Sequence, residues 1–202
     1  MQILLATGNL GKLREIEHEI RQAGLCDIQL RPLSTVPSPQ SVLEDRPTFI
    51  GNAVKKARAY AAQSGILTLA DDSGLCVDAL AGEPGVQSAR YAGEPCNDAA
   101  NNAKLLQALA GVADAHRTAR FVCAMALASP AATIAIVQAW VAGAILLTPR
   151  GGNGFGYDPL FLIESLGKTT AELSLEQKST LSHRGQAIRK MLAVLRSGIL
   201  PT

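Results

Sequence analysis

Apolar residues in the first part of the chain fall into compact runs, typical of strands, and stretches with helical spacing. A compact run covers residues 2–7, and Leu13, Ile16 and Ile20 then recur at the three- and four-residue spacing of a helix face. Gly24 follows and is expected to end that helix, because glycine readily adopts the left-handed conformation of helix ends. The pattern therefore predicts a strand, a loop and a helix.

The next segment repeats this order. Residues 31–47 are rich in Pro, Ser and Thr, and we expect them to form a loop from a second strand to a second helix. That helix is predicted to begin near Thr48 and to end at Gly65, and a third strand follows it directly. Successive strand-loop-helix units predict an α/β fold.

The stretch of residues 66–75 contains the third predicted strand and two adjacent carboxylates. Its apolar run stops at Asp71 and Asp72, and Ser73 and Gly74 follow, so we expect a buried strand that ends at the acids, at the edge of the sheet. Such a pair can bind a hard cation, or one aspartate can accept a proton from water. The same residues are also ordinary turn formers, so the pair alone leaves both interpretations open.

The middle of the chain predicts one helix and one hairpin. A helix is expected over residues 98–110, with Asn97 as its cap. Residues 118–128 and 133–147 have partly alternating apolar positions and many β-branched residues, and a short connection joins them, which predicts a β-hairpin. A hairpin beside parallel units implies a mixed sheet.

Two helices are predicted near the C-terminus. Ser174 and Gln177 match a capping box that starts a short helix, and the last helix begins just before His183 and ends at Gly198. His183 and Arg184 oppose the dipole at the start of that helix, which suggests that they serve a ligand. The predicted core stripe of the last helix consists of Ile188, Met191, Leu192 and Leu195.

Composition limits the classes of protein to which the chain can belong. Its 202 residues suit one domain over residues 1–202, with room for two lobes, and the 48% hydrophobic content excludes general disorder. A net charge of +2 gives no indication of a nucleic-acid surface. No apolar run reaches the length of a membrane span and no secretory leader is evident, so we expect a cytoplasmic protein with no membrane partner.

The cysteines are widely spaced and contain no CxxC pair. This spacing does not make a zinc site, and disulfides are not expected in a reducing compartment. We expect these side chains to be small apolar fillers. They are Cys26, Cys76, Cys96 and Cys123.

A glycine-bearing loop lies between the first strand and the first helix. It directs backbone N–H groups and the positive helix end toward one place, and Lys12 adds a full charge there, which suits a phosphate. The GxxxxGK[ST] spacing of the nucleotide P-loop is missing, and glycine is common at such joints, so the loop alone is weak evidence. Its candidate contact residues are Thr7, Gly8, Asn9, Leu10, Gly11 and Lys12.

A second glycine-rich loop covers residues 149–159. Its glycines allow the backbone to approach a flat ligand, and Phe155 could stack on that ligand. A flexible linker is the alternative, but linkers seldom combine Phe, Tyr and Asp. We therefore favour a ligand loop that includes Phe155, Gly156, Tyr157 and Asp158.

Several motifs in the same order resemble those of the inosine triphosphate pyrophosphatase family, whose members hydrolyse deaminated purine nucleoside triphosphates to the monophosphate and pyrophosphate. They cover almost the full length of the chain, and six in the right order are a specific signal. The matching segments are 7–12 (TGNLGK), 48–53 (TFIGNA) with Lys56 and Ala57, 70–75 (ADDSGL), 88–91 (SARY), 154–159 (GFGYDP) and 182–184 (SHR).

The resemblance implies a long, twisted mixed sheet flanked by helices, in two lobes with a nucleotide cleft between them, and a homodimer. It implies that Mg²⁺ is bound by Glu44 and Asp72, that Asp72 is also the proton acceptor, that Ser73 lies next to the phosphates and that Phe155 stacks on the base. The residues implied to hold the triphosphate are Thr7, Asn9, Lys12 and Lys56. Those implied to recognise the edge of the base are Asp158, Lys178, Ser182, His183 and Arg184.

One position departs from the family pattern. Gly51 stands where members usually carry an acid, so a further metal contact from this position is not expected.

Two other functions stay open beside the Mg²⁺-dependent hydrolysis of ITP, dITP and XTP. One is a nucleotide-binding sensor without turnover, and the other is a related pyrophosphatase for modified pyrimidine nucleotides. An obligate structural partner is a third view that the sequence cannot test.

Overall fold

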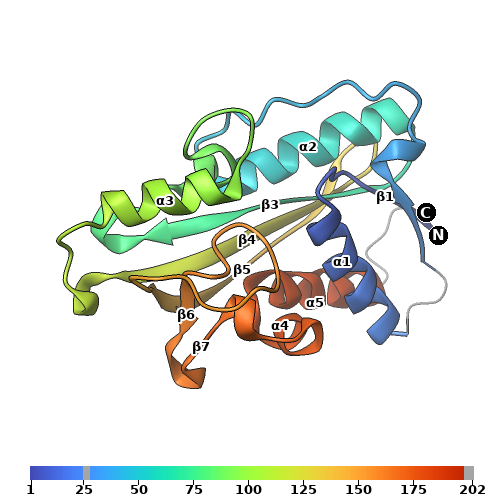
Figure 1. The fold of residues 1–202 in the computed structure, drawn as a ribbon. Helices are drawn as coiled ribbons and strands as arrows, with labels where there is room; N and C mark the ends of the chain where they lie inside the picture. Colours follow the sequence, from blue (N-terminus) through green and yellow to red (C-terminus); the bar gives the residue numbers. More distant parts are fainter. Residues whose placement is uncertain (25–27, 198–202) are drawn as a thin grey trace. The chain divides into compact units, whose positions relative to one another are not determined.

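The computed structural model describes residues 1–24 and 28–197 (Figure 1). Cys26 and the predicted helix end at Gly198 lie outside these residues. The helices are α1 (Leu10–Gln22), α2 (Phe49–Ser64), α3 (Asp98–Ala108), α4 (Leu175–Leu181) and α5 (His183–Arg196). The strands are β1 (Gln2–Leu5), β2 (Gln29–Pro32), β3 (Thr68–Val77), β4 (Thr118–Ala128), β5 (Thr133–Ile145), β6 (Phe161–Ile163) and β7 (Lys168–Thr169).

The strands of the described residues form one mixed sheet. Their order is β2-β1-β3-β4-β5-β6-β7. Strand β1 pairs in parallel with β2 and β3, whereas β5 with β6 and β6 with β7 pair antiparallel. The predicted α/β fold with a mixed sheet and flanking helices is therefore confirmed.

The chain divides into two compact units. The first consists of residues 1–72, 123–139 and 184–202, and the second of residues 73–122 and 140–183. The chain passes from one unit to the other within β3, β4 and β5. Each of these strands therefore has one part in each unit.

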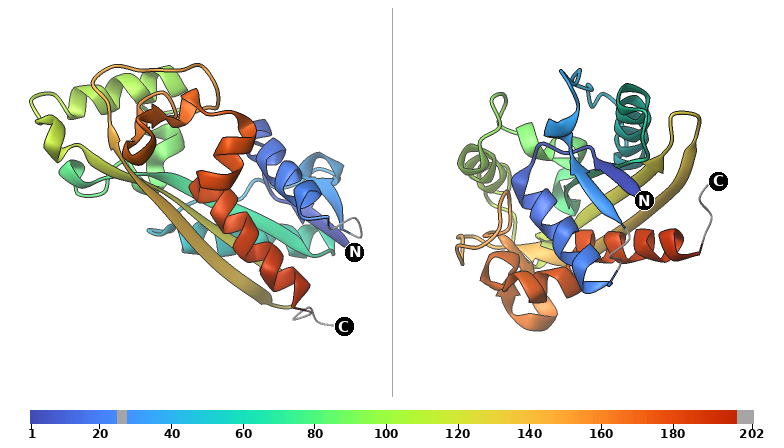
Figure 2. Two further views of the ribbon diagram at one scale, coloured as in Figure 1. Left: turned by 90° about the horizontal axis from the view of Figure 1, so that it is seen from below. Right: turned by 90° about the vertical axis from the view of Figure 1, so that its right-hand side faces the viewer.

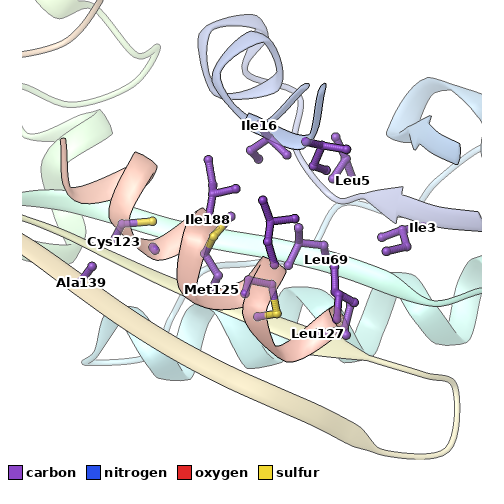
Figure 3. Close-up of a cluster of buried hydrophobic side chains, with 14 residues drawn as sticks. Ile3, Leu5, Ile16, Leu69, Cys123, Met125, Leu127, Ala139 and Ile188 are labelled. Carbon is purple, nitrogen blue, oxygen red and sulfur yellow. The ribbon is translucent and has the colours of Figure 1, made fainter. Parts of the chain in front are cut away.

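In the first unit, side chains of the strands alternate between two apolar clusters. Leu5, Leu69 and Met125 belong to a cluster that includes residues of α1 and α5 (Figure 3). Leu4 and Ala70 belong to another cluster, with the alanine face of α2. Figure 2 shows α1 and α5 side by side, in agreement with the shared cluster that contains residues of both helices. This unit thus has helices on both faces of its strands, as successive strand-loop-helix segments predict.

In the second unit, one cluster joins α3 to the strand ends. Leu105 of α3 and Leu109, which follows the end of that helix, are fully buried there, beside Leu75 of β3 and Phe161 of β6. The rings of Phe121 and Phe161 lie 4.5 Å apart. The core therefore supports the loop between β5 and β6, which contains the predicted ligand residues.

The helix ends follow the sequence signals. The side chains of Asn9, Thr48, Asn97 and Ser174 cap α1, α2, α3 and α4. Gly65 ends α2 with a left-handed φ of 74°. The predicted boundaries at Thr48, Gly65, Asn97 and Ser174 are confirmed, because local capping chemistry sets them, whereas the cap at Asn9 was not predicted.

Two predictions are wrong. Strand β3 does not end at the acids: it continues through Asp71, Asp72 and Ser73 to Val77. Both acids are buried in the middle of the strand, so the ordinary rule that polar residues end a strand fails here. Cys96 is exposed rather than buried, whereas Cys76 and Cys123 are buried as expected.

No helix among residues 1–24 and 28–197 is both long and apolar enough to cross a bilayer.

Candidate active site

The loop between β1 and α1 is shaped by its own side chains. Asn9 Oδ1 accepts hydrogen bonds from the backbone N–H groups of Gly11 and Lys12, at 2.8 and 3.1 Å. Thr7 Oγ1 accepts one from the N–H of Asn9 at 3.1 Å. The two polar side chains therefore fix the loop at the positive end of α1, where an anion is favoured.

Lys12 extends from this loop to a buried carboxylate. Its Nζ lies 2.8 Å from Oδ2 of Asp71, and the same oxygen lies 3.6 Å from Nε of Arg184. Arg184 also forms an ion pair with Glu15. Burial disfavours the ionised form of Asp71, but Lys12 and Arg184 outweigh it and hold the pKa of Asp71 well below its usual range. Asp71 is therefore a fixed negative charge.

A second ion pair joins the buried Lys56 of α2 to the half-buried Glu44. Lys56 Nζ lies 3.2 Å from Oε1 of Glu44, which lies in the loop before the helix. Burial disfavours the ammonium form of Lys56, but Asp71, Glu44 and Asp72 outweigh it and raise the pKa of Lys56 above its ordinary value. A permanent positive charge therefore stands beside these carboxylates.

Asp72 is held by a fully buried amide. Asn52 Nδ2 donates to Oδ2 of Asp72 at 3.0 Å, and Asn52 Oδ1 accepts from the N–H of Arg46 at 2.8 Å. Burial raises the pKa of Asp72 to about 6, against the opposing effects of Lys56 and the Asn52 hydrogen bond. Asp72 thus has a fixed orientation and the ordinary ability of a carboxylate to bind a cation or a proton.

In the second unit, Asp158 and Lys178 form a buried ion pair. Lys178 Nζ lies 2.7 Å from Oδ2 of Asp158, with side-chain exposures of 7% and 5%. The same oxygen accepts from the N–H of Phe155 at 2.8 Å, and Oδ1 accepts from the hydroxyl of Thr170 at 2.8 Å. Lys178 also lies 5.0 Å from the centre of the Phe155 ring. An ammonium donor and an aromatic face therefore come together.

Three other predicted site residues of the second unit, Tyr157, Ser182 and His183, lie outside the Asp158–Lys178 pair. The Tyr157 hydroxyl donates to the carbonyl oxygen of Ser88 at 2.8 Å, and burial raises the pKa of Tyr157 above its usual value. The imidazole of His183 stacks on Phe121 with ring centres 4.8 Å apart. Ser182 is buried between α4 and α5. Tyr157 and His183 thus have structural contacts whatever their role toward a ligand.

Comparison with known proteins decides the family. A family model described as the Ham1 family matches residues 3–194. The chain belongs to the Ham1 family. The resemblance to inosine triphosphate pyrophosphatases that six motifs predict is therefore confirmed.

Curated relatives and solved structures agree with this membership. A dITP/XTP pyrophosphatase of Desulforamulus reducens is 48% identical over 195 residues, which is 96% of either chain. A dITP/XTP pyrophosphatase of Aromatoleum aromaticum is 49% identical over 203 residues, or 98% of either chain. The Ham1 protein structure from Coxiella burnetii matches with a TM-score of 0.88 and 40% identity, over 98% of this chain and 100% of that one.

In this Ham1 protein, several residues that hold the predicted site residues in place were not themselves predicted from the sequence. Asn52 precedes Lys56 by one helical turn, so both project from the same face of α2, and this spacing could have identified it. Glu15 follows Lys12 at the same kind of spacing on α1. No sequence signal distinguishes Thr170. The substrate-binding and catalytic roles assigned to the predicted residues stay predictions.

The departure at Gly51 has a steric basis in this chain. A Cβ atom at position 51 would lie 2.8 Å from Cβ of Arg46 and 3.0 Å from Oγ1 of Thr48, the helix cap. A side chain there would displace the loop whose backbone Asn52 holds. Glycine therefore allows this loop to pack against the start of α2.

Gly154→Ala should destabilise the second unit. A Cβ atom at 154 would lie 2.1 Å from Oδ2 of Asp158, and the residue has a left-handed φ of 83°. Together these effects should lower the free energy of unfolding by about 2 kcal/mol or more. Gly152→Ala is the matched control, since a Cβ at 152 meets nothing within 4 Å. Urea unfolding measures both, and equal stability of the two variants would contradict the observed loop geometry.

Proposed function

We propose that this Ham1-family protein hydrolyses deaminated purine nucleoside triphosphates, namely ITP, dITP and XTP, to the monophosphate and pyrophosphate, and so removes them from the nucleotide pool. The observation that carries the proposal is the group of cations around the buried Asp71 and Asp72, namely the half-buried Lys12 and the buried Lys56. The two relatives compared above are named dITP/XTP pyrophosphatases, which supports a pyrophosphatase reaction on such nucleotides.

The first unit would hold the phosphates. The proposed step is in-line attack of water at the α-phosphorus with pyrophosphate as the leaving group, and negative charge then spreads over the equatorial and bridging oxygens. Lys12 and Lys56 would stabilise that charge, with Thr7 and Asn9 fixing the loop that carries Lys12. Asp72, oriented by Asn52, would orient the water and accept its proton.

Glu44 and Asp72 fit Mg²⁺ as its protein ligands. Mg²⁺ is usually bound by one or two carboxylates together with substrate phosphates and water. The described residues contain no cluster of three or more His, Cys, Asp or Glu side chains that could hold a metal ion. When bound, Mg²⁺ would neutralise phosphate charge and polarise the reacting phosphoryl group.

The second unit would recognise the base. Hypoxanthine and xanthine present an acceptor oxygen at carbon 6, where adenine presents a donor amino group. Lys178, held by Asp158 beside the Phe155 ring, is a donor, so adenine would leave it facing another donor. An unpaired buried polar group costs on the order of 1–3 kcal/mol, and more when it is charged, which supports discrimination against adenine.

The function is tested by product release from ITP, XTP, dITP, GTP, ATP and dUTP, with Mg²⁺ and with a chelator. We expect pyrophosphate from ITP, XTP and dITP far faster than from ATP or GTP, and no release with the chelator. Fastest turnover of dUTP would favour the pyrimidine alternative. Binding of ITP without turnover would favour a sensor. A sensor would tolerate the loss of Asp72 and Lys12, but both residues are present.

A homodimer is proposed on a separate observation. Ile136 and Trp140 lie four residues apart on β5 and are 47% and 57% exposed, so this strand carries two large apolar side chains at the surface. Trp140→Lys should therefore shift the protein from dimer to monomer, as measured by sedimentation equilibrium. Leu175→Lys, at another exposed apolar position on α4, should leave the dimer intact. A monomeric wild type would contradict the proposal.

The cytoplasmic location also stays a prediction.

A further inference from the structure

In the second unit, one face of α3 holds the loop that carries Phe155. Asp98 Oδ2 accepts a hydrogen bond from the backbone N–H of Gly156 at 2.7 Å. Asn102 Nδ2 donates to the carbonyl oxygen of the same glycine at 2.9 Å. The two side chains are four residues apart on α3, so they lie on one face of the helix. Asp98 and Asn102 therefore form a clamp that holds both backbone polar groups of Gly156.

The clamp helps to determine the direction of the Phe155 side chain. A peptide group is planar, so a hydrogen bond to its N–H orients the whole group. Asp98 orients the peptide group between Phe155 and Gly156. Asp158 Oδ2 orients the preceding one, because it accepts from the N–H of Phe155 at 2.8 Å. Both peptide groups that flank Phe155 are thus held, and together they set the direction in which its ring leaves the chain.

The clamp acts on a residue with little conformational preference of its own. Gly156 has a left-handed φ of 61°, and a Cβ atom at this position would meet nothing within 4 Å. Glycine reaches many backbone conformations at little cost. Without the two hydrogen bonds from α3, the chain after Phe155 could therefore turn in several directions.

Helix α3 is itself firmly held within the second unit. Leu105 is fully buried in the apolar cluster of this unit. Asn101, which is 1% exposed, donates to the carbonyl oxygen of Ala89 at 3.0 Å and accepts from the N–H of Ala92 at 2.7 Å. Groups that project from a well-packed helix are placed more exactly than groups on a loop. The clamp therefore gives the loop a fixed point of attachment.

We infer that Asp98 and Asn102 are positioning residues for binding of the base, and that they act through the backbone of Gly156 on the ring of Phe155. The inference deepens the proposed function and rests on it in one respect, namely that Phe155 stacks on a purine base. Every base has a π-face, so stacking tolerates different bases. The clamp should therefore set the affinity for purine nucleotides in general, whereas Lys178 sets the choice among them.

The test uses Asn102→Leu, because the Asn102 contact is the more buried of the two. Inosine monophosphate and inorganic tripolyphosphate are titrated separately into the full-length variant by calorimetry, and KM and kcat are measured for ITP and ATP. Binding of inosine monophosphate should weaken about tenfold and both KM values should rise similarly, because a misplaced ring loses much of its stacking energy. Affinity for tripolyphosphate, which has no base, should stay within about twofold, as should kcat and the preference for ITP over ATP.

Gln107→Leu is the matched control, because it removes an exposed amide from the last turn of the same helix. This variant should bind both ligands as the wild type does. At the other side of the clamp, Asp98→Asn keeps an acceptor oxygen for the N–H of Gly156. It should therefore lose less affinity for inosine monophosphate than Asp98→Ala does.

A double-mutant cycle separates positioning of the ring from a general effect on stability. In a Phe155→Ala background, Asn102→Leu should not weaken binding of inosine monophosphate further. Additive losses, equal losses for inosine monophosphate and tripolyphosphate, or no loss in Asn102→Leu would overturn the inference, as would a wild type that does not bind inosine monophosphate. If the wild type fails to hydrolyse ITP but Asn102→Leu weakens binding of inosine monophosphate only when Phe155 is present, the proposed function fails and the inference stands.

Discussion

Asp72→Asn should abolish turnover of ITP while binding of ITP stays measurable. The substitution keeps the shape of the side chain and its place beside Asn52, but it removes the proton acceptor and one proposed Mg²⁺ ligand. Loss of a positioned general base should lower kcat by about 10³-fold. Initial rates of pyrophosphate release measure kcat, and calorimetry with ITP and Mg²⁺ measures binding to the inactive variant.

Asp45→Asn is the control for this experiment. Asp45 lies next to Glu44 in the same loop, but it is exposed and pairs with Lys55 at 2.7 Å. Exposed ion pairs contribute little to stability, so this variant should retain nearly all activity. A turnover rate in Asp72→Asn close to that of Asp45→Asn would remove Asp72 from the catalytic role.

Lys178→Met should lower both the selectivity for oxopurines and the stability of the protein. The preference for ITP over ATP, measured as the ratio of kcat/KM values, should fall by about tenfold or more because the donor that pairs with the oxygen at carbon 6 is gone. Asp158 would also be left as a buried charge without its ammonium partner, which costs about 3–5 kcal/mol of unfolding free energy.

Two further variants separate selectivity from stability. Lys178→Arg keeps a positive donor near Asp158 and should retain part of the preference for ITP. Lys168→Met changes an exposed lysine of β7 and should alter neither quantity. If Lys178→Met remains folded at the assay temperature and keeps the wild-type ratio, recognition of the base lies elsewhere.

Local chemistry explains why much of the fold could be predicted from the sequence. The caps at Thr48, Asn97 and Ser174 and the stop at Gly65 depend on residues within one turn of the helix end. The stripe on α5 is buried in one cluster because helical spacing places it on one face. Such features need no knowledge of distant parts of the chain.

Strand β3 could not be predicted from local chemistry alone. Asp71 and Asp72 interrupt an apolar run, and sequence rules take such an interruption as an end. The strand continues because Lys12 and Arg184 pair with one acid and Asn52 binds the other. These partners are distant in the sequence, so the burial of the two acids is a tertiary effect.

The supporting residues of the candidate site show the same limit. Lys12, Lys56 and Asp158 could be selected because they lie in recognisable motifs, whereas Lys178 is indicated only by the family resemblance. Thr170 holds Asp158 across 12 positions of sequence, and its identity carries no local signal. A motif therefore predicts which residues meet a ligand more readily than it predicts which residues hold them in place.

The position of water attack tests the central claim most directly. ITP is hydrolysed in ¹⁸O-labelled water with Mg²⁺, and the products are analysed by mass spectrometry. The account predicts that the label enters the inosine monophosphate and that the pyrophosphate stays unlabelled, as attack at the α-phosphorus requires. Labelled pyrophosphate, or inosine diphosphate together with labelled orthophosphate, would contradict it.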